Sequence, residues 1–389
     1  MNRFCSIFSQ LLKLFPRLEF ERQVTAHRAE YHARGFSCWE QFVAMLFCQL
    51  GRAQSLREIC GGLATCEGKL VHLGVPEAPK KSTLAYANAQ RPWQLYRATF
   101  DALLERCQHA VAGRGKQFRF KNKLLSIDAT VIELCASLFD WAKFRRTKGA
   151  VKLHLVLDHD GYLPSVAVIT PGKHADVRVA RRLRFEPGTI LIMDRGYLDF
   201  AWFARLIATG VFFVTRPKHN TAYEVVEKRA FPANSLIVAD EVIRLTGPQA
   251  RRDCPHLLRR IEVVVPETGE LLTLLTNHLA FAAPTIAAIY KDRWQIELLF
   301  KALKQNLRIK TFVGTTANAL HIQIWTALIA MLILRYLQLR ARFSWSLSNL
   351  VALLRMNLFV HRDLWRWLNE PFESPPEIPQ PLQTTFAFA

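Results

Sequence analysis

The sequence has 389 residues, of which 50% are hydrophobic and 11% are aromatic. This length accommodates two or three folded domains, and the composition excludes a largely disordered chain. The 52 Lys and Arg residues outnumber the 32 Asp and Glu residues, so the formal charge is +20. Such an excess favours polyanionic partners, either nucleic acids or anionic membranes, and does not choose between them.

Targeting segments are not expected. The first residues carry one basic side chain and an interrupted apolar stretch, without a small-residue cleavage site, so we predict no secretory signal. The eight cysteines are scattered and form no CxxC pair, which is typical of reduced thiols in a cytosolic protein. The most apolar segment, 322–334, is shorter than the roughly 20 residues that a membrane helix needs. We interpret it as a buried core helix.

Residues 1–110 are predicted to be helical, because apolar residues recur at spacings of three and four. Ser55 is the expected N-cap of a helix that begins at Leu56. A loop with the pair Lys80-Lys81 follows, and Ser82 or Thr83 is expected to open the next helix. Two helices joined by a basic loop suit DNA binding. Helix pairs are common in other proteins, so an ordinary helical domain stays open at this point.

The pattern changes near residue 111, after a linker rich in Gly, Lys and Arg. Apolar runs of strand length, rich in Val, Ile and Leu, follow at 124–127, 151–157, 164–169, 189–193 and 211–215. Residues 158–161 (Asp-His-Asp-Gly) are expected to form a hairpin turn. Together with helical spacing at 173–184 and 198–209, these runs predict a mixed α/β sheet. Residues 216–285 are again β-rich, 285–339 and 347–359 are helical, and a Pro-rich tail is not expected to pack.

Two acidic residues directly follow apolar strands. Asp128 comes after 124–127, and Asp194 comes after 189–193. The ends of strands are where α/β sheets place their functional sites, and acids on neighbouring strands could converge on one metal ion. Each acid alone could instead cap a turn. In particular, Asp194 is followed by Arg-Gly, which could form a turn in which glycine supplies a positive φ.

A third acid lies in the helical region after 285. Four polar residues occur at offsets of 0, 3, 7 and 14, namely Tyr290, Arg293, Glu297 and Lys304. On one continuous helix they share a stripe roughly 60° wide. An acid between two bases and a tyrosine is a poor core face. The alternative is a simple Arg293–Glu297 ion pair on a solvated surface.

Such a set of residues suits phosphoryl transfer. Three carboxylates, Asp128, Asp194 and Glu297, would bind Mg²⁺ through oxygen, and two ions could assist an in-line displacement. No Ser or Cys nucleophile is then required. Arg293, Lys304 and Tyr290 would hold phosphate oxygens. Trp294 could stack on an unpaired base at a distorted DNA end, or it could simply pack against the protein.

The motifs match a known family. The segments Ser-Ile-Asp-Ala-Thr (126–130) and Ile-Met-Asp-Arg-Gly-Tyr (192–197), followed by the Y-x2-R-x3-E-x6-K pattern from Tyr290 to Lys304, resemble the insertion-sequence-4 group of DDE transposases. The match covers about residues 120–335. Ser82-Thr83-Leu84 and Arg91 also look like the helical DNA-binding domain of such proteins. Ala129 departs from the hydroxyl residue that many relatives carry, at a position that is not a metal ligand.

The resemblance implies a ribonuclease-H-like catalytic core with a β-rich insertion, flanked by helical regions. The implied domains are a DNA-binding domain at 1–110, a catalytic domain at 111–335 with its insertion at about 216–285, and a C-terminal region at 336–389. It implies that Asp128, Asp194 and Glu297 form a catalytic triad that uses Mg²⁺, with Mn²⁺ as a substitute. Further candidate DNA contacts are Arg195 and Lys152. The alternative for Lys152, and for His154 on the same strand, is a polar residue on the exposed face of an edge-like strand.

The expected partners are double-stranded DNA with terminal inverted repeats, target DNA and a second copy of the chain. The expected reaction is metal-dependent cleavage and strand transfer in cut-and-paste transposition, in the cytoplasm of a bacterium and on its nucleoid. Two alternatives stay open, a metal-dependent DNA nuclease without strand transfer and a catalytically silent DNA-binding derivative. A membrane-surface protein is not expected, because the strand-rich middle lacks long basic amphipathic helices.

Overall fold

The computed structural model describes residues 5–31, 33, 35–66, 68–111, 118–135, 143–145, 148–307 and 312–372. Its contacts divide the chain into two compact units, which we describe separately. The helical unit comprises 1–111 and 302–389, and the sheet unit comprises 112–301. The predicted linker lies largely outside the described residues, as does the Pro-rich tail from residue 373 onward.

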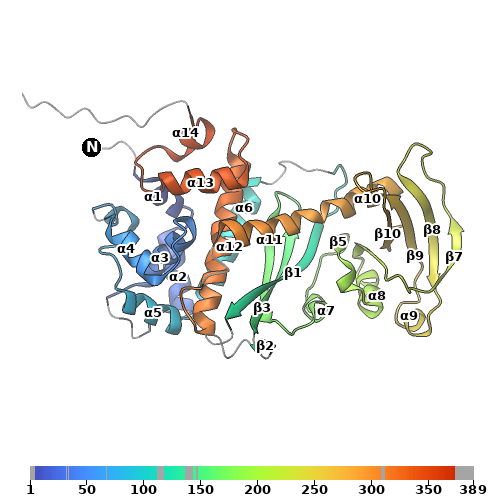
Figure 1. The fold of residues 1–389 in the computed structure, drawn as a ribbon, viewed down its shortest axis with the longest axis horizontal. Coiled ribbons are helices and arrows are strands. Elements are labelled where there is room, and N and C mark those ends of the chain that lie inside the picture. Colours follow the sequence, from blue (N-terminus) through green and yellow to red (C-terminus); the bar gives the residue numbers. More distant parts are fainter. Residues whose placement is uncertain are drawn as a thin grey trace, which may run out of the picture. The chain divides into compact units, whose positions relative to one another are not determined.

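The helical unit is built around one long helix (Figure 1). Its helices are α1 (Ile7–Leu12), α2 (Arg17–Ala26), α3 (Cys38–Leu50), α4 (Leu56–Ala64), α5 (Lys81–Gln90), α6 (Gln94–Val111), α12 (Ala317–Arg340), α13 (Leu347–Asn357) and α14 (Leu364–Asn369), with a 3₁₀ turn η1 (Val71–Leu73). Helix α12 contacts α3, α5, α6 and α13. Segments from both ends of the chain therefore share one core.

Helix α12 is the predicted core helix, although it is longer than the apolar segment suggested. By length and composition alone it could cross a membrane, yet 83% of its most apolar window is buried inside the protein. Apolar side chains are buried on all sides of it between Ala319 and Leu337. A helix surrounded by other helices buries every face, which explains why its sequence is apolar all round.

The predicted helix starts in this unit are close to the observed ones. Ser55 caps α4, since its side chain accepts a hydrogen bond from the backbone N–H of Glu58, as predicted. Helix α5 begins at Lys81 and its N-cap is Lys80, so it starts one or two residues before Ser82 or Thr83. The predicted boundary near 111 coincides with the end of the first segment of the helical unit, whereas residues 302–335, assigned from sequence to the catalytic domain, pack in the helical unit.

The sheet unit contains one mixed sheet, in the order β2-β3-β1-β5-β6-β10-β9-β8-β7, with β4 paired to β3. Its strands are β1 (Leu124–Cys135), β2 (Lys143–Arg145), β3 (Lys148–Asp158), β4 (Leu163–Pro171), β5 (Ile190–Met193), β6 (Phe212–Thr215), β7 (Tyr223–Lys228), β8 (Ile237–Leu245), β9 (Leu258–Val264) and β10 (Leu271–Thr276). Its helical elements are α7 (Asp176–Ala180), η3 (Arg195–Tyr197), α8 (Phe200–Ala208), α9 (Pro248–Asp253), α10 (Ala283–Asp292) and most of α11 (Trp294–Asn306).

Strands β1, β5 and β6 run parallel, and the other pairs are antiparallel. The β-rich region predicted at 216–285 forms β7 to β10, which extend the same sheet through the pairing of β10 with β6. The expectation of a mixed α/β sheet is therefore confirmed.

Each face of the central strands has its own core. Leu191, Met193 and Phe213 pack with α8 on one face. Ile190, Ile192 and Val214 pack with α10 on the other. Because successive side chains of a strand point to opposite faces, a residue's position in β5 decides which helix it meets.

The predicted hairpin turn connects β3, which ends at Asp158, to β4, which begins at Leu163. Gly161 has a φ of 83° and Tyr162 a φ of 54°, so both adopt the left-handed region. Glycine tolerates this conformation, whereas tyrosine pays an energetic cost there. Tyr162 must therefore be held by contacts that compensate for the strain.

Candidate active site

Asp128 and Asp194 lie at equivalent positions on neighbouring strands. The parallel ladder between β1 and β5 ends with Ile127 opposite Met193, so the next residue on each chain is one of the two acids. Both follow the alternation that turns Leu124, Ile190 and Ile192 toward α10. The two carboxylates therefore project from the same sheet face at the same height.

The prediction that Asp128 ends its strand is wrong. Strand β1 continues to Cys135, because β3 pairs with it over the whole length from Leu125 to Cys135. Asp128 itself lies opposite Leu155 of β3. What ends at Asp128 is the parallel pairing to β5, and among the described strands none pairs with that edge of β1 from the acid onward.

Asp194 caps a turn, which is the role that the sequence offered as the alternative to metal binding. Its side chain accepts a hydrogen bond of 2.8 Å from the backbone N–H of Gly196 and so caps the turn η3. Gly196 is not among the glycines with positive φ, so the turn does not need glycine for that reason. A Cβ at Gly196 would lie 3.0 Å from a carboxylate oxygen of Asp194. Glycine leaves room beside the acid.

Glu297 is tied to Asp128 through Arg293. The guanidinium of Arg293 lies 2.6 Å from Oε1 of Glu297 and 3.7 Å from Oδ2 of Asp128. It also lies 5.7 Å from the centroid of the Tyr290 ring, within range of a cation–π contact. The simple ion pair expected as the alternative is present, and it also engages an acid from the sheet.

The helix that carries these residues is interrupted at Arg293. Helix α10 ends at Asp292 and α11 begins at Trp294. The N–H of Arg293 bonds to the carbonyl of Tyr290, and the N–H of Ile296 bonds to the carbonyl of Arg293. Both hydrogen bonds join residues three positions apart, as in a 3₁₀ helix, and they tighten the helix locally. The prediction of a shared stripe assumed one continuous helix. Despite the interruption, Tyr290, Arg293 and Glu297 lie close together.

The acids repel one another. The pKa of Asp128 is raised to about 6, first by burial and further by the charges of Asp194 and Glu297, while the N–H of Ala129 and the guanidinium of Arg293 act in the opposite direction. Burial also raises the pKa of Tyr197, with additional contributions from Asp128 and Asp194. Negative charge thus accumulates at this point, as it would at a cation-binding site.

The donor set suits a hard divalent cation, because it consists of carboxylate oxygens. Within the described ranges, no group of three or more His, Cys, Asp or Glu side chains gathers closely enough to form a ready-made metal site. The guanidinium of Arg293 lies between Asp128 and Glu297 instead. In this conformation, Arg293 therefore provides the positive charge that faces both carboxylates.

The remaining candidate DNA contacts differ in exposure. Trp294 is 56% exposed, which does not fit the interpretation that it simply packs in the core. Arg195 is also exposed. Lys304 lies in the last turn of α11, in the part that packs with the helical unit.

Lys152 is a weaker candidate than the sequence suggested. Its ammonium lies 2.8 Å from the carboxylate of Asp176 and 3.0 Å from the carbonyl of His174. Its neighbour on the strand, His154, is buried and bonds to Thr170. Neither residue lies on an exposed strand face, and Asp176 already neutralises the charge of Lys152.

Sequence reasoning missed Arg216, which directly follows β6. Val214 of β6 lies opposite Ile192 of β5, so Arg216 falls opposite Asp194 two residues further on. Its charge acts on Tyr290, whose pKa is raised by burial despite the opposing effects of Arg293 and Arg216. The signal available in the sequence was an arginine directly after an apolar strand, the same signal that identified the two aspartates.

Sequence reasoning also missed a cluster formed by the buried Ser126, His159 and Asp292 and the half-buried Tyr162. His159 was assigned only to a turn, and Asp292 was given no role. The two residues are 133 positions apart, and no local pattern connects them.

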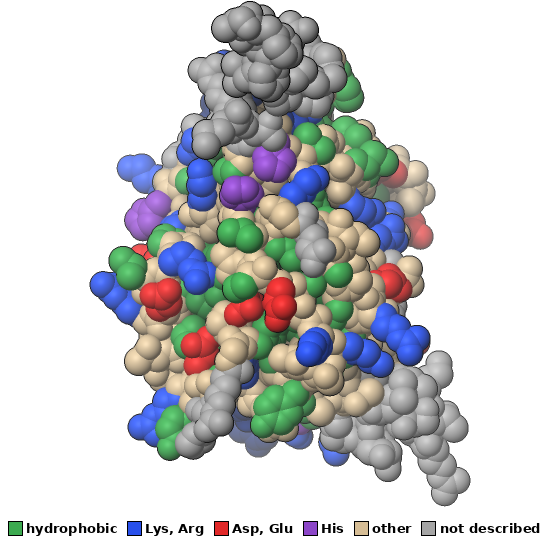
Figure 2. Space-filling model, turned by 90° about the vertical axis from the view of Figure 1, so that its left-hand side faces the viewer, with side chains coloured by type: hydrophobic (Ala, Val, Ile, Leu, Met, Phe, Trp, Pro, Cys, Tyr) green, Lys and Arg blue, Asp and Glu red, His purple; other side chains and the backbone are tan. Residues whose placement is uncertain are grey.

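Helix α5 of the helical unit presents a polar surface with Lys81, Ser82 and the 71% exposed Tyr86. Arg91, by contrast, donates to backbone carbonyls of Phe36 and Ser37 and to Gln41, so it stabilises the unit internally. Figure 2 shows the side of the molecule on which α4 and α5 lie. Lys and Arg side chains are scattered over it, and acidic ones gather near the centre of the view.

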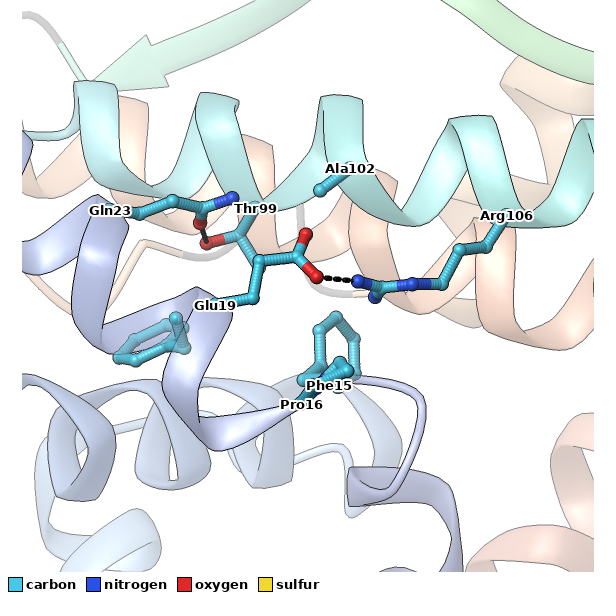
Figure 3. Close-up of a pocket in the computed structure, with 8 residues that line it drawn as sticks. Phe15, Pro16, Glu19, Gln23, Thr99, Ala102 and Arg106 are labelled. Carbon is cyan, nitrogen blue, oxygen red and sulfur yellow. Dashed lines mark hydrogen bonds and ion pairs between the residues drawn. The ribbon is translucent and has the colours of Figure 1, made fainter.

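A small cavity of the helical unit is not a substrate site. It lies between α2 and α6, where Arg106 pairs with Glu19 and Thr99 bonds to Gln23 (Figure 3). Its volume is about 10 Å³, the lower limit for one water molecule. The candidate acids lie in the sheet unit instead, where the side chains of Asp128 and Glu297 are 19% and 33% exposed.

Comparisons with known proteins agree with the motifs. Residues 119–333 match the model of the family "Transposase DDE domain", and residues 5–76 match a domain of unknown function (DUF4372). A putative transposase of Sinorhizobium fredii is 33% identical over 82% of this chain and 88% of its own length. A probable transposase for insertion sequence element IS5377 of Geobacillus stearothermophilus is 27% identical over 66% of this chain and 67% of its own.

More distant relatives extend the comparison. The Escherichia coli transposase InsG for insertion sequence element IS4 is 25% identical over 48% of this chain and 43% of its own. The solved synaptic complex of piggyBac transposase with hairpin DNA aligns with 95% of this chain and 86% of its own, at 12% identity and a TM-score of 0.41, below the level that assigns a common fold. On the family match and the relatives together, this chain belongs to the insertion-sequence-4 family of DDE transposases, enzymes that cut and transfer DNA strands.

Proposed function

We propose that Asp128, Asp194 and Glu297 are the catalytic carboxylates of this transposase and its metal ligands. The observation that carries the proposal is the alignment of Asp128 and Asp194 at the end of the β1–β5 ladder, with Glu297 linked to Asp128 through Arg293. A carboxylate triad on two adjacent strands and one helix needs no protein nucleophile.

DDE transposases generally use divalent metal ions. For this chain we propose two Mg²⁺ ions, with Mn²⁺ as a substitute. Such ions, when bound, assist the attacking hydroxyl and stabilise the leaving oxygen of an in-line displacement at phosphorus. The carboxylates would hold them. Burial raises the pKa of Asp128 and the charges of Asp194 and Glu297 raise it further, and bound cations would favour the ionised carboxylate against both effects.

The basic and aromatic residues around the acids would position DNA. Arg293 and Tyr290 lie next to the carboxylates and can hold phosphate oxygens, and Arg216 extends this row beyond Asp194. The exposed indole of Trp294 offers a stacking surface for an unpaired base. Arg195 and Lys304 would contact the DNA backbone, and Lys152 would contribute only if DNA displaces it from Asp176.

The domain roles follow from the same reasoning. The strands around β1, β5 and β6 would form a ribonuclease-H-like core, and residues 216–285 would be its β-rich insertion. Residues 1–110 would bind the terminal inverted repeats, with α5 and its exposed Lys81 and Tyr86 among the contacts. We propose a homodimer on DNA that performs cut-and-paste transposition in the bacterial cytoplasm, at the nucleoid.

The decisive experiment is cleavage of a DNA fragment that carries the flanking inverted repeats, with Mg²⁺ or with EDTA, by wild type and Asp128→Ala. Metal-dependent cleavage at the repeat ends by the wild type alone is the expected result. Cleavage by Asp128→Ala at the wild-type rate would overturn the triad assignment. Tight binding without cleavage under any metal would identify a silent derivative, and cleavage without joining to target DNA would identify a nuclease.

A further inference from the structure

A hydrogen-bonded network of four side chains, three of them buried, adjoins the segments that carry the candidate acids. Oγ of Ser126 is 2.7 Å from Nε2 of His159, and Nδ1 of His159 is 2.5 Å from Oδ2 of Asp292. The hydroxyl of Tyr162 donates to both oxygens of Asp292, at 3.3 and 3.4 Å. An ionised carboxylate can only accept, so Asp292 takes hydrogen bonds from the imidazole and the phenol together.

This arrangement resembles a hydrolytic Ser-His-Asp triad in chemistry only. Ser126 is fully buried inside strand β1, and His159 and Asp292 are 7% and 6% exposed. No substrate carbonyl can reach the serine hydroxyl in this position, so the hydrogen-bonded network does not form a second active site. Any role of the network must therefore lie in how it positions the segments of the protein that it connects.

The network joins three segments that carry or adjoin the candidate catalytic residues. Ser126 precedes Asp128 by two positions, so both side chains lie on the same face of β1. His159 and Tyr162 belong to the turn between β3 and β4. Asp292 is the last residue of α10, and the next residue is Arg293, where the helix tightens before α11 begins.

Two features of the network are unfavourable by themselves. A buried aspartate at the C-terminal end of a helix opposes the helix dipole and loses its hydration. Tyr162 adopts a left-handed conformation, with a φ of 54°, which is strained for a residue other than glycine. Neither the local backbone preference of tyrosine nor the charge preference of a helix end favours these features. Both residues take part in the same contact, the hydrogen bond from the Tyr162 hydroxyl to Asp292.

We propose that Asp292, held by His159 and Tyr162, is a positioning residue that sets the α10–α11 junction, and through it the placement of Arg293 and Glu297 opposite Asp128. The inference rests on the proposed function, because it assigns Glu297 to the metal site. Ser126 anchors the other end of the network on β1. The hydrogen-bonded network thus links β1, which carries Asp128, to the end of α10, directly before the helix that carries Glu297. These two carboxylates must approach each other to share a cation.

Metal affinity tests this role without relying on catalysis. The probe is Mn²⁺, and its binding to the full-length protein is followed by electron paramagnetic resonance. Outer-sphere residues that orient metal ligands typically change affinity or activity by about 10- to 100-fold. Asp292→Ala should therefore weaken Mn²⁺ binding by at least about tenfold, and Asp292→Asn, which keeps one acceptor oxygen, should recover part of the loss.

Asp240→Ala is the matched control. Asp240 is a buried aspartate of the same unit that pairs with the buried Arg259, and neither residue touches the acids of the site. Both alanine variants should lower the melting temperature, and only Asp292→Ala should weaken Mn²⁺ binding. Equal Mn²⁺ affinity in the two variants would show that the hydrogen-bonded network only stabilises the fold and would overturn the proposal.

Ser126→Ala covers the case in which Asp292→Ala does not fold. It removes one hydroxyl from the network and should weaken Mn²⁺ binding in the same direction by a smaller factor, whereas unchanged binding would contradict the proposal. Failure of the proposed function has a different signature. Asp128→Ala would then bind Mn²⁺ and cleave DNA like the wild type, whatever the behaviour of the Asp292 variants.

Discussion

Replacing Asp128 by Asn should stabilise the metal-free protein. Burial raises the pKa of Asp128 to about 6 in the folded state, from the ordinary value of 3.8 for an aspartate. A carboxyl whose pKa is raised by folding destabilises the fold once it ionises. Asparagine cannot ionise, and its carbonyl oxygen can still accept the hydrogen bond that the N–H of Ala129 donates to Asp128.

The magnitude follows from the pKa difference. About two pH units, at about 1.4 kcal/mol each, amount to about 3 kcal/mol. Well below pH 3.8, Asp128 is protonated in both states and the two proteins should be equally stable. The wild type should lose stability relative to the variant as the pH rises from about 4 to about 6, and the difference should then stay constant. For a unit of this size it corresponds to a melting temperature about 6–12 °C higher in Asp128→Asn at pH 7.5.

Differential scanning calorimetry in EDTA at pH 7.5 and at pH 4 measures this difference. Adding Mg²⁺ should raise the melting temperature of the wild type and leave Asp128→Asn nearly unchanged, since only the wild type keeps the ligand. Equal melting temperatures at pH 7.5 would show that Asp128 is not destabilised by ionisation. A difference as large at pH 4 as at pH 7.5 would have another origin than charge.

Three other substitutions probe separate parts of the molecule. Glu297→Gln should abolish cleavage of repeat-end DNA, and gel-shift affinity should stay close to wild type because binding rests on positive charge; cleavage at the wild-type rate would remove Glu297 from the triad. Lys304→Ala should weaken end binding and reduce the slope of log affinity against log salt by about one. An unchanged slope would place Lys304 away from phosphate. Arg259→Met should lower the free energy of unfolding by about 3–5 kcal/mol in urea titrations, because it leaves Asp240 buried without its charge partner. Adding Asp240→Leu to that variant should restore most of the loss, and no recovery would mean that the carbonyl contacts of Arg259 matter more than the ion pair.

Local sequence patterns determined much of the candidate site. Apolar runs identified the strands before Asp128 and Asp194, and the three- and four-residue spacing brought Tyr290, Arg293 and Glu297 to one side of a helix. The N-cap at Ser55 and the core helix at 322–334 could be predicted for the same reason. These features depend on neighbours within about four residues, through strand alternation and helical periodicity.

Other features were decided only by pairings between distant segments. Strand β1 continues past Asp128 because β3 supplies its hydrogen bonds, and Lys152 is neutralised by Asp176, 24 residues away. Asp292 and His159, which are hydrogen-bonded, are 133 residues apart in the sequence. Which buried polar groups can satisfy each other depends on the register of the whole sheet and on where α10 packs, because burial allows polar groups to persist only where a partner is in reach. The sequence alone therefore indicated the acids and the chemistry, whereas the tertiary structure decided which groups support them.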